Sequence, residues 1–92
     1  MKYVYYAIFE YSSEEEISKG VYPVGIYFPD FLGCVSGADN TEYGVEMAKE
    51  VLKLRIESDI EDKIILPNPV DKMDLEKKLA QNERLVEIIV EI

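Results

Sequence analysis

Alternation of side chains along the first ten residues predicts a β-strand, because successive residues of a strand point to opposite faces. Both alternating sets in residues 2–11 are apolar or aromatic, and they read Tyr3, Tyr5, Ala7, Phe9 against Val4, Tyr6, Ile8. Such a strand is central in its sheet and needs cover on both faces, from the same chain or, on one face, from a partner.

The end of the chain repeats the alternation with a different outer face. Residues 84–92 place Val86, Ile88, Val90 and Ile92 on one side and Glu87, Ile89 and Glu91 on the other. We therefore predict a half-buried last strand with an acidic outer face.

Two shorter strands are predicted at residues 21–28 and 33–37, joined by a tight turn. Pro29 ends the first ladder, Asp30 can bond backbone N–H groups two residues on, and Gly33 can take a positive φ. Phe31 and Leu32 then lie half exposed at the tip. Within the first of these strands, Pro23 and Gly25 weaken the ladder, which places that strand at or near an edge or gives it a bulge.

Helical spacing appears twice. Residues 39–41 form a capping cluster for a long helix that fades around residues 58–62, with an apolar stripe at Val45, Ala48, Val51, Leu52 and Ile56. Met47 and Leu54 lie beside this stripe, where they can meet another subunit. An extended connector at residues 64–70 leads to a short helix at 71–80.

The acidic segment 12–19, with Glu14, Glu15 and Glu16 in a row, reads as a solvated loop, with a single turn of helix as the alternative. The element order is then β-β-β-α-α-β. It predicts an α+β fold in which a three-stranded antiparallel meander and a last strand carry one long helix, all within a single domain at residues 1–92.

Charge and composition narrow the function. The net charge of −9 argues against direct nucleic-acid binding, since phosphate binding needs clustered Lys and Arg, and it favours a basic protein partner. There is no His, only one Cys and no glycine-rich phosphate loop, so no cofactor or metal site is expected. Cys34 reads as a small buried hydrophobe. No apolar run is long enough to cross a membrane, and a cytoplasmic location is the default expectation.

Several of these pieces together resemble the HicB family, the antitoxin half of HicA–HicB toxin–antitoxin pairs. The matching segments are residues 5–10 (YYAIFE), 27–37 (YFPDFLGCVSG), 39–42 (DNTE), 48–52 (AKEVL) and 66–69 (LPNP), followed by the acidic-apolar last strand. The chain departs from the family pattern at Phe31-Leu32-Gly33, where members usually have Leu-Pro-Gly, and at Gly44, where an acidic residue is common. Many members also continue into a DNA-binding module, whereas this sequence ends at Ile92, so operator binding is not expected of it.

The resemblance implies a degraded RNase H-like fold and a protein that is not an enzyme. It also implies binding to a small, basic, RNA-cleaving toxin of the HicA type, which is neutralised when its RNA-binding surface is covered. We predict Tyr27 and Phe31 as apolar anchors, with Asp30 and the acidic run Glu14, Glu15, Glu16 beside them. For Tyr27, ordinary packing on the sheet is an equally good explanation. For the three glutamates, a solvated loop is the simpler explanation.

Two other functions remain open at this stage. A HicB-like homo-oligomer without a toxin partner is the first, because the two-sided first strand and the second strand favour self-association. An RNase H-like nuclease is the second, and the sequence argues against it. Metal-dependent cleavage needs converging carboxylates, one of them typically in the middle of the first strand, where this chain has Tyr5, Tyr6 and Ala7.

Overall fold

The strand β1 (Lys2–Tyr11) lies in the interior of a four-stranded antiparallel sheet with the order β3-β2-β1-β4. The computed structural model describes all residues, 1–92. β1 pairs with β2 (Val24–Tyr27) through its second half and with β4 (Glu83–Glu91) along nearly all of its length. β3 (Val35–Ala38) pairs with the other side of β2. The predicted α+β class and the central position of the first strand are confirmed.

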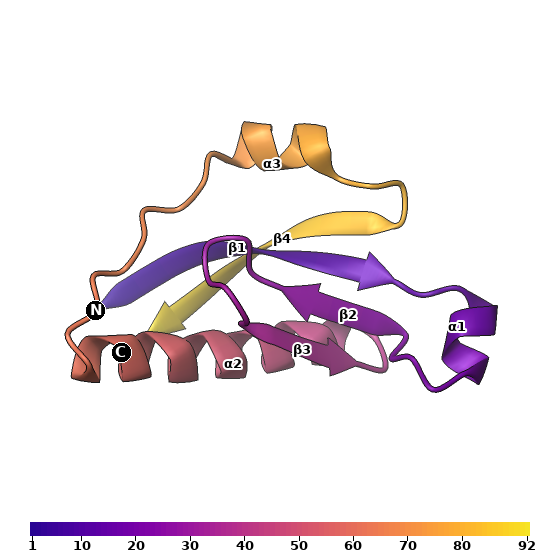
Figure 1. Ribbon diagram of the computed structural model, residues 1–92, viewed down its shortest axis with the longest axis horizontal. Coiled ribbons are helices and arrows are strands. Elements are labelled where there is room, and N and C mark those ends of the chain that lie inside the picture. The colour runs from indigo at the N-terminus through magenta and orange to yellow at the C-terminus, as the bar shows by residue number, and fades with distance from the viewer.

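The long helix α2 (Thr41–Glu61) covers one face of this sheet (Figure 1). Asn40 caps it, since its side chain accepts a hydrogen bond from the Tyr43 N–H at 2.7 Å. Small and apolar residues recur every four positions on the buried side, namely Gly44, Ala48, Leu52 and Ile56. A Cβ at position 44 would lie only 3.0 Å from the Phe9 ring. The glycine therefore allows a close approach between helix and sheet.

The C-terminal end of α2 closes in a Schellman motif with a lysine in the usual glycine position. Lys63 has a φ of +58°. Its N–H bonds to the Ile60 carbonyl at 3.1 Å, and the Ile64 N–H bonds to the Asp59 carbonyl at 2.8 Å. This pairing satisfies carbonyls that the helix itself leaves free.

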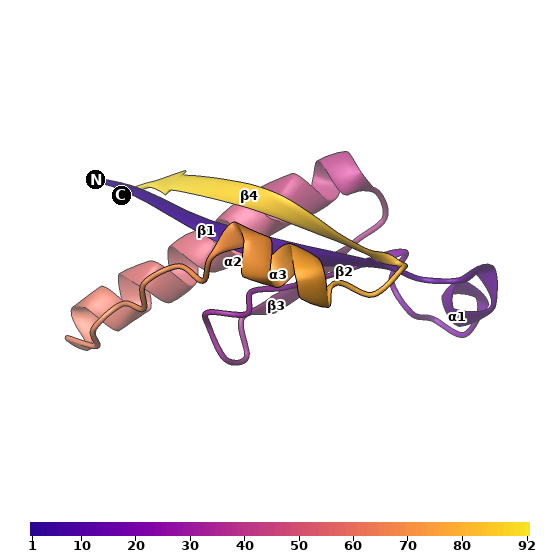
Figure 2. The same cartoon turned by 90° about the horizontal axis from the view of Figure 1, so that it is seen from above.

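The short helix α3 (Lys72–Lys78) lies over the opposite face of the sheet, as Figures 1 and 2 show from two directions. Asp71 caps it by accepting from the Met73 N–H at 2.8 Å. Leu75 of α3 is buried, and so is Ile8 on the outward face of β1. The second face of the first strand is thus covered in part by the same chain.

The structure corrects three local predictions, which concern α1 and the bounds of β2 and β3. Residues Glu14–Ser18 form a one-turn helix, α1, rather than a loop, because Ser13 and Glu16 build a reciprocal capping box. β2 begins at Val24, after Pro23, and β3 begins two residues later and ends one residue later than predicted. β2 lies near an edge, as predicted, because it is next to the edge strand β3. The end of α2 at Glu61 lies within the predicted range, residues 58–62. None of the helices has the length and apolar character needed to cross a membrane.

Candidate partner-binding surface

The turn between β2 and β3 is closed by its own main chain. The Phe28 N–H bonds to the Cys34 carbonyl at 3.2 Å, and the N–H groups of Phe31 and Cys34 each bond to a carbonyl three residues earlier at 3.1 Å. Gly33 has a φ of +78°, which residues with a side chain adopt only under strain. The tight turn predicted at Pro29–Gly33 is therefore present.

Phe31 points into the protein, so the prediction of a half-exposed ring at this position is wrong. Only 3% of Phe31 is exposed, whereas 94% of its neighbour Leu32 is exposed. The Phe31 ring meets Tyr5 edge to face, with 4.7 Å between centroids and 71° between planes. The turn folds back far enough to insert one of its two apolar residues into the core. Phe31 is therefore not available as an anchor, and Leu32 is the apolar side chain at the tip.

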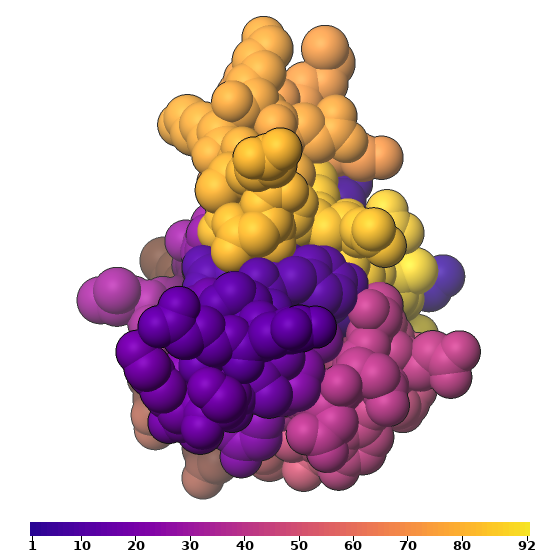
Figure 3. Space-filling view, turned by 90° about the vertical axis from the view of Figure 1, so that its right-hand side faces the viewer, coloured from indigo at the N-terminus to yellow at the C-terminus, as the bar shows by residue number.

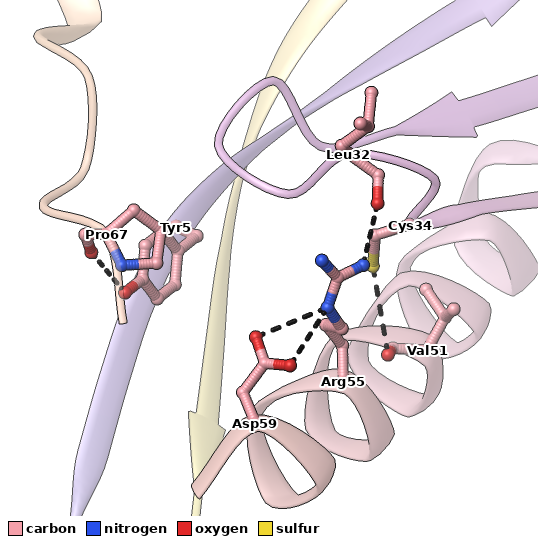
Figure 4. Close-up of polar contacts among 7 residues, drawn as sticks. All are labelled: Tyr5, Leu32, Cys34, Val51, Arg55, Asp59 and Pro67. Atoms are coloured by element: carbon pink, nitrogen blue, oxygen red, sulfur yellow. Dashed lines mark hydrogen bonds and ion pairs between the residues drawn. The ribbon is translucent and has the colours of Figure 1, made fainter. Parts of the chain in front are cut away.

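Arg55 of α2 holds this turn against the helix (Figure 4). One guanidinium nitrogen donates to the Leu32 carbonyl at 2.8 Å, and Nε donates to both carboxylate oxygens of Asp59 at 3.3 Å. The guanidinium also lies 5.5 Å from the centre of the Phe31 ring, a cation–π arrangement. Asp59 is buried and has Arg55 as its charge partner. The sequence analysis missed this pair, although its spacing of four residues beside an apolar stripe is visible.

Cys34 completes the attachment of the turn to α2. Its Sγ lies 3.9 Å from the Val51 carbonyl (Figure 4), and the side chain is buried, as predicted. Burial raises the pKa of the thiol; Arg55 opposes this rise and Asp59 adds to it. The thiol is thus a packed side chain in its protonated form.

Asp30 attaches the turn to the 64–70 connector rather than to its own backbone. Its carboxylate accepts from the Val70 N–H at 3.2 and 3.4 Å, so the predicted bond to a residue two positions on is replaced by one that reaches 40 residues along the chain. Burial raises the pKa of Asp30, and the Val70 N–H opposes that rise. The Tyr5 hydroxyl, which donates to the Pro67 carbonyl at 2.6 Å, fixes the same connector a second time (Figure 4).

Tyr27 lies on the outward face of β2 and is half-buried. Its hydroxyl donates to the Glu83 carboxylate at 3.0 Å. Burial, this hydrogen bond and the charges of Glu83 and Glu10 together raise the pKa of Tyr27 to about 12. Packing on the sheet, the alternative kept open for Tyr27, accounts for these contacts.

The acidic run Glu14–Glu16 lies at the opposite end of β2 from the turn (Figure 1). Figure 3 looks onto that end of the molecule, where the indigo segment that contains α1 forms the surface below the projecting α3. Glu16 belongs to the capping box with Ser13, and Glu15 pairs with Lys19 at 3.2 Å. The structure therefore does not gather the six predicted site residues into one patch.

Two shallow grooves flank α2 on its exposed side. One, of about 360 Å³, runs beside the edge strand β4 and is lined by Glu46, Lys49, Glu50, Lys53, Ile89, Val90 and Glu91. The other, of about 170 Å³, runs beside the edge strand β3 and is lined by Ser36, Met47, Glu50, Val51 and Leu54. The first groove is mostly charged and the second mostly apolar. The chain has no group of three or more His, Cys, Asp or Glu side chains arranged to hold a metal ion.

Comparison with solved structures identifies the fold. A chain of a toxin–antitoxin complex from Streptococcus pneumoniae superposes with a TM-score of 0.77 and 20% sequence identity, over 99% of this chain and 70% of that chain. A chain of the HicA3 and HicB3 toxin–antitoxin complex superposes with a TM-score of 0.65 and 18% identity, over 98% of this chain and 100% of that chain. No model of a known protein family and no curated protein sequence matches. The resemblance found in the sequence is therefore confirmed at the level of the fold.

Proposed function

We propose that this protein is an antitoxin-like binding module that neutralises a small, basic, RNA-cleaving toxin of the HicA type. The observation that carries the proposal is the fold, which nearly the whole chain shares with chains of two toxin–antitoxin complexes. The protein acts by covering the RNA-binding surface of the toxin, not by chemistry of its own. In support, the middle of β1 holds the buried residues Tyr5 and Ala7 where a nuclease of the RNase H type would need a carboxylate.

The charge of the chain supports a basic partner. Nineteen acidic residues stand against ten basic ones. A surface that binds RNA must present clustered Lys and Arg, and such a surface is attracted to an acidic protein before contact is made. Complementary charge raises the association rate and disfavours partners of the wrong sign. An acidic protein is therefore suited to cover the RNA site of such a toxin.

Leu32 is the apolar anchor that this structure offers at the tip of the turn. The side chain is almost fully exposed, while its backbone is held by Arg55. A large apolar group presented on a braced turn loses little conformational entropy on binding. Asp30 and Tyr27 adjoin the same turn, and their contact with the toxin stays part of the proposal. Contact through Glu14, Glu15 and Glu16 requires a partner that also reaches the other end of β2.

An RNA-cleavage assay tests the proposal. A HicA-type toxin, or the protein encoded beside this chain, is assayed with and without the protein, and the amount needed for half-inhibition is measured. We expect full suppression by the wild type and a requirement about tenfold or more higher for Leu32→Ser, as for loss of an interface anchor. Ile65→Ser is the matched control, because Ile65 is 93% exposed and lies in the connector.

Three results would contradict the proposal in different ways. Undiminished cleavage at a large excess of the protein removes the antitoxin function and leaves a homo-oligomer without a toxin partner. Suppression that Leu32→Ser and Ile65→Ser affect equally keeps the function but removes Leu32 from the interface. RNA cleavage by this protein alone removes its non-enzymatic character.

A further inference from the structure

The two edges of the sheet differ sharply in charge. Figure 2 shows β3 and β4 on opposite sides of the sheet. β4 carries Glu83, Glu87 and Glu91, one at every fourth position. β3 reads Val-Ser-Gly-Ala, without charge and without proline. Proteins ordinarily guard an exposed strand edge with charges, prolines or bulges. β4 has protecting charges, whereas β3 has neither charge nor proline and is protected only by its length of four residues.

Self-pairing would have opposite consequences at the two edges. If two copies of β4 paired antiparallel about Glu87, that residue would face its own copy, and Glu83 would face Glu91 of the other chain. Like charges directly opposite each other destabilise a sheet. Two copies of β3 paired about Ser36 would bring together only small, uncharged side chains. With a net charge of −9 on each chain, a second copy can approach closely only where charge is absent.

The residues that line the groove beside β3 are placed so that they can contact a second copy across a two-fold axis. Ser36 lines it together with Met47 and Leu54, which lie on the same side of α2 and seven residues apart. Seven residues span about 10.5 Å of helix. A two-fold axis at Ser36 would bring the second α2 alongside the first in the antiparallel direction. Met47 of each chain would then face Leu54 of the other, as an isologous contact requires. Leu54 is 61% exposed in the single chain.

We propose that the β3 edge and the adjoining groove form a homodimer interface, in which the two four-stranded sheets join into one and Met47 packs against Leu54 across the axis. This interface is independent of the proposed antitoxin function, which uses the tip of the turn. Glu50 is the one charged residue in the groove and would lie close to its own copy at the axis. The dimer is therefore weakened by this repulsion and strengthened by salt, which screens it.

The mass in solution tests the dimer directly. Sedimentation equilibrium of the full chain should give twice the mass of 10.6 kDa for one chain. Leu54→Glu should weaken dimerisation about tenfold or more, since it removes the apolar contact with Met47 and adds a negative charge to the groove that already holds Glu50. Glu50→Gln should tighten it. Ile60→Glu is the matched control, because Ile60 is an exposed apolar residue of the same helix that lies outside the groove and should leave the mass unchanged.

A cross-link tests the register. With Ser36 opposite Ser36 in an antiparallel pair, the two Cα atoms lie about 4.5–5.5 Å apart, which a disulfide can span. Ser36→Cys should therefore give a covalent dimer under mild oxidation. The wild type should not, because Cys34 is buried.

Each of the remaining outcomes overturns the proposal. A wild-type chain that stays monomeric at millimolar concentration has no such interface. A dimer that survives Leu54→Glu but is lost with Ile89→Glu uses the β4 edge instead. A monomer whose toxin binding is abolished by Leu54→Glu uses the β3 edge for the toxin and not for a second copy. None of these results bears on whether the wild type inhibits the toxin, so the two proposals fail separately.

Discussion

Adjacent residues at the tip of the β2–β3 turn should respond oppositely to truncation. Phe31 is 3% exposed and Leu32 is 94% exposed. Replacing a buried Phe by Ala costs about 3–5 kcal/mol, and this range includes the edge-to-face contact with Tyr5, worth about 0.5–1.5 kcal/mol. A domain of this length has a total stability of about 5–14 kcal/mol. Phe31→Ala should therefore remove a large share of it, while Leu32→Ala should stay within about 0.5 kcal/mol of the wild type.

Urea unfolding followed by circular dichroism measures both effects. For a small domain with a slope of about 1–2 kcal/mol per molar urea, a loss of about 3–5 kcal/mol should lower the midpoint for Phe31→Ala by about 1.5–5 M. The midpoint for Leu32→Ala should not move, and the slopes should stay the same. The reasoning is refuted if Phe31→Ala unfolds within about 1 kcal/mol of the wild type, or if Leu32→Ala is the more costly change. Either result would mean that the turn does not insert Phe31 into the core in solution.

Three further changes test other contacts. Lys63→Gly should stabilise the protein by up to about 1 kcal/mol, because glycine adopts the positive φ of this position without strain, whereas Lys63→Ala should bring no such gain in the same urea titration. Arg55→Ala should cost about 2 kcal/mol by leaving Asp59 buried without its partner, and adding Asp59→Asn should recover part of that loss in a double-mutant cycle. For Tyr27, whose pKa is raised from 10.0 to about 12, the folded state holds the proton more tightly than the unfolded state. Its contribution to stability is complete below pH 10 and lost as pH rises to about 12, so Tyr27→Phe should flatten the alkaline loss of stability in that range, and unchanged alkaline unfolding would contradict the Glu83 contact.

Some elements of this fold are determined by the local sequence pattern, and others are not. β1, α3 and most of α2 were predicted to within a few residues. Their periodicity and caps lie within the element itself, so no distant residue is needed to read them. α1 was a borderline case, because the capping box at Ser13 and Glu16 decides between a loop and one turn of helix within three residues. The acidic last strand was equally readable from its alternation.

The candidate site was less predictable than the fold. The pattern placed Asp30 and Leu32 in a turn, but it did not tell which of Phe31 and Leu32 would be buried. That choice depends on Tyr5, which lies 26 residues earlier in the chain, and on Arg55. The three glutamates of α1 were predicted to lie beside the apolar residues of the turn in one interface. The structure places α1 and the turn at opposite ends of β2. Spatial grouping of this kind needs the pairing of the strands.

The sequence by itself determined the four strands and the helices α2 and α3, the order of these elements, the acidic character of the chain and the resemblance that the fold confirms. Only the tertiary structure decided that β3 and not β2 is the free edge, that α3 covers the second face of β1, and that Asp30 reaches Val70 rather than its own turn. The physical reason is the range of the interactions. Helix and strand periodicity arise between near neighbours in the chain, whereas edges, buried faces and charge pairs depend on which distant segments pack together, and no local pattern encodes that choice.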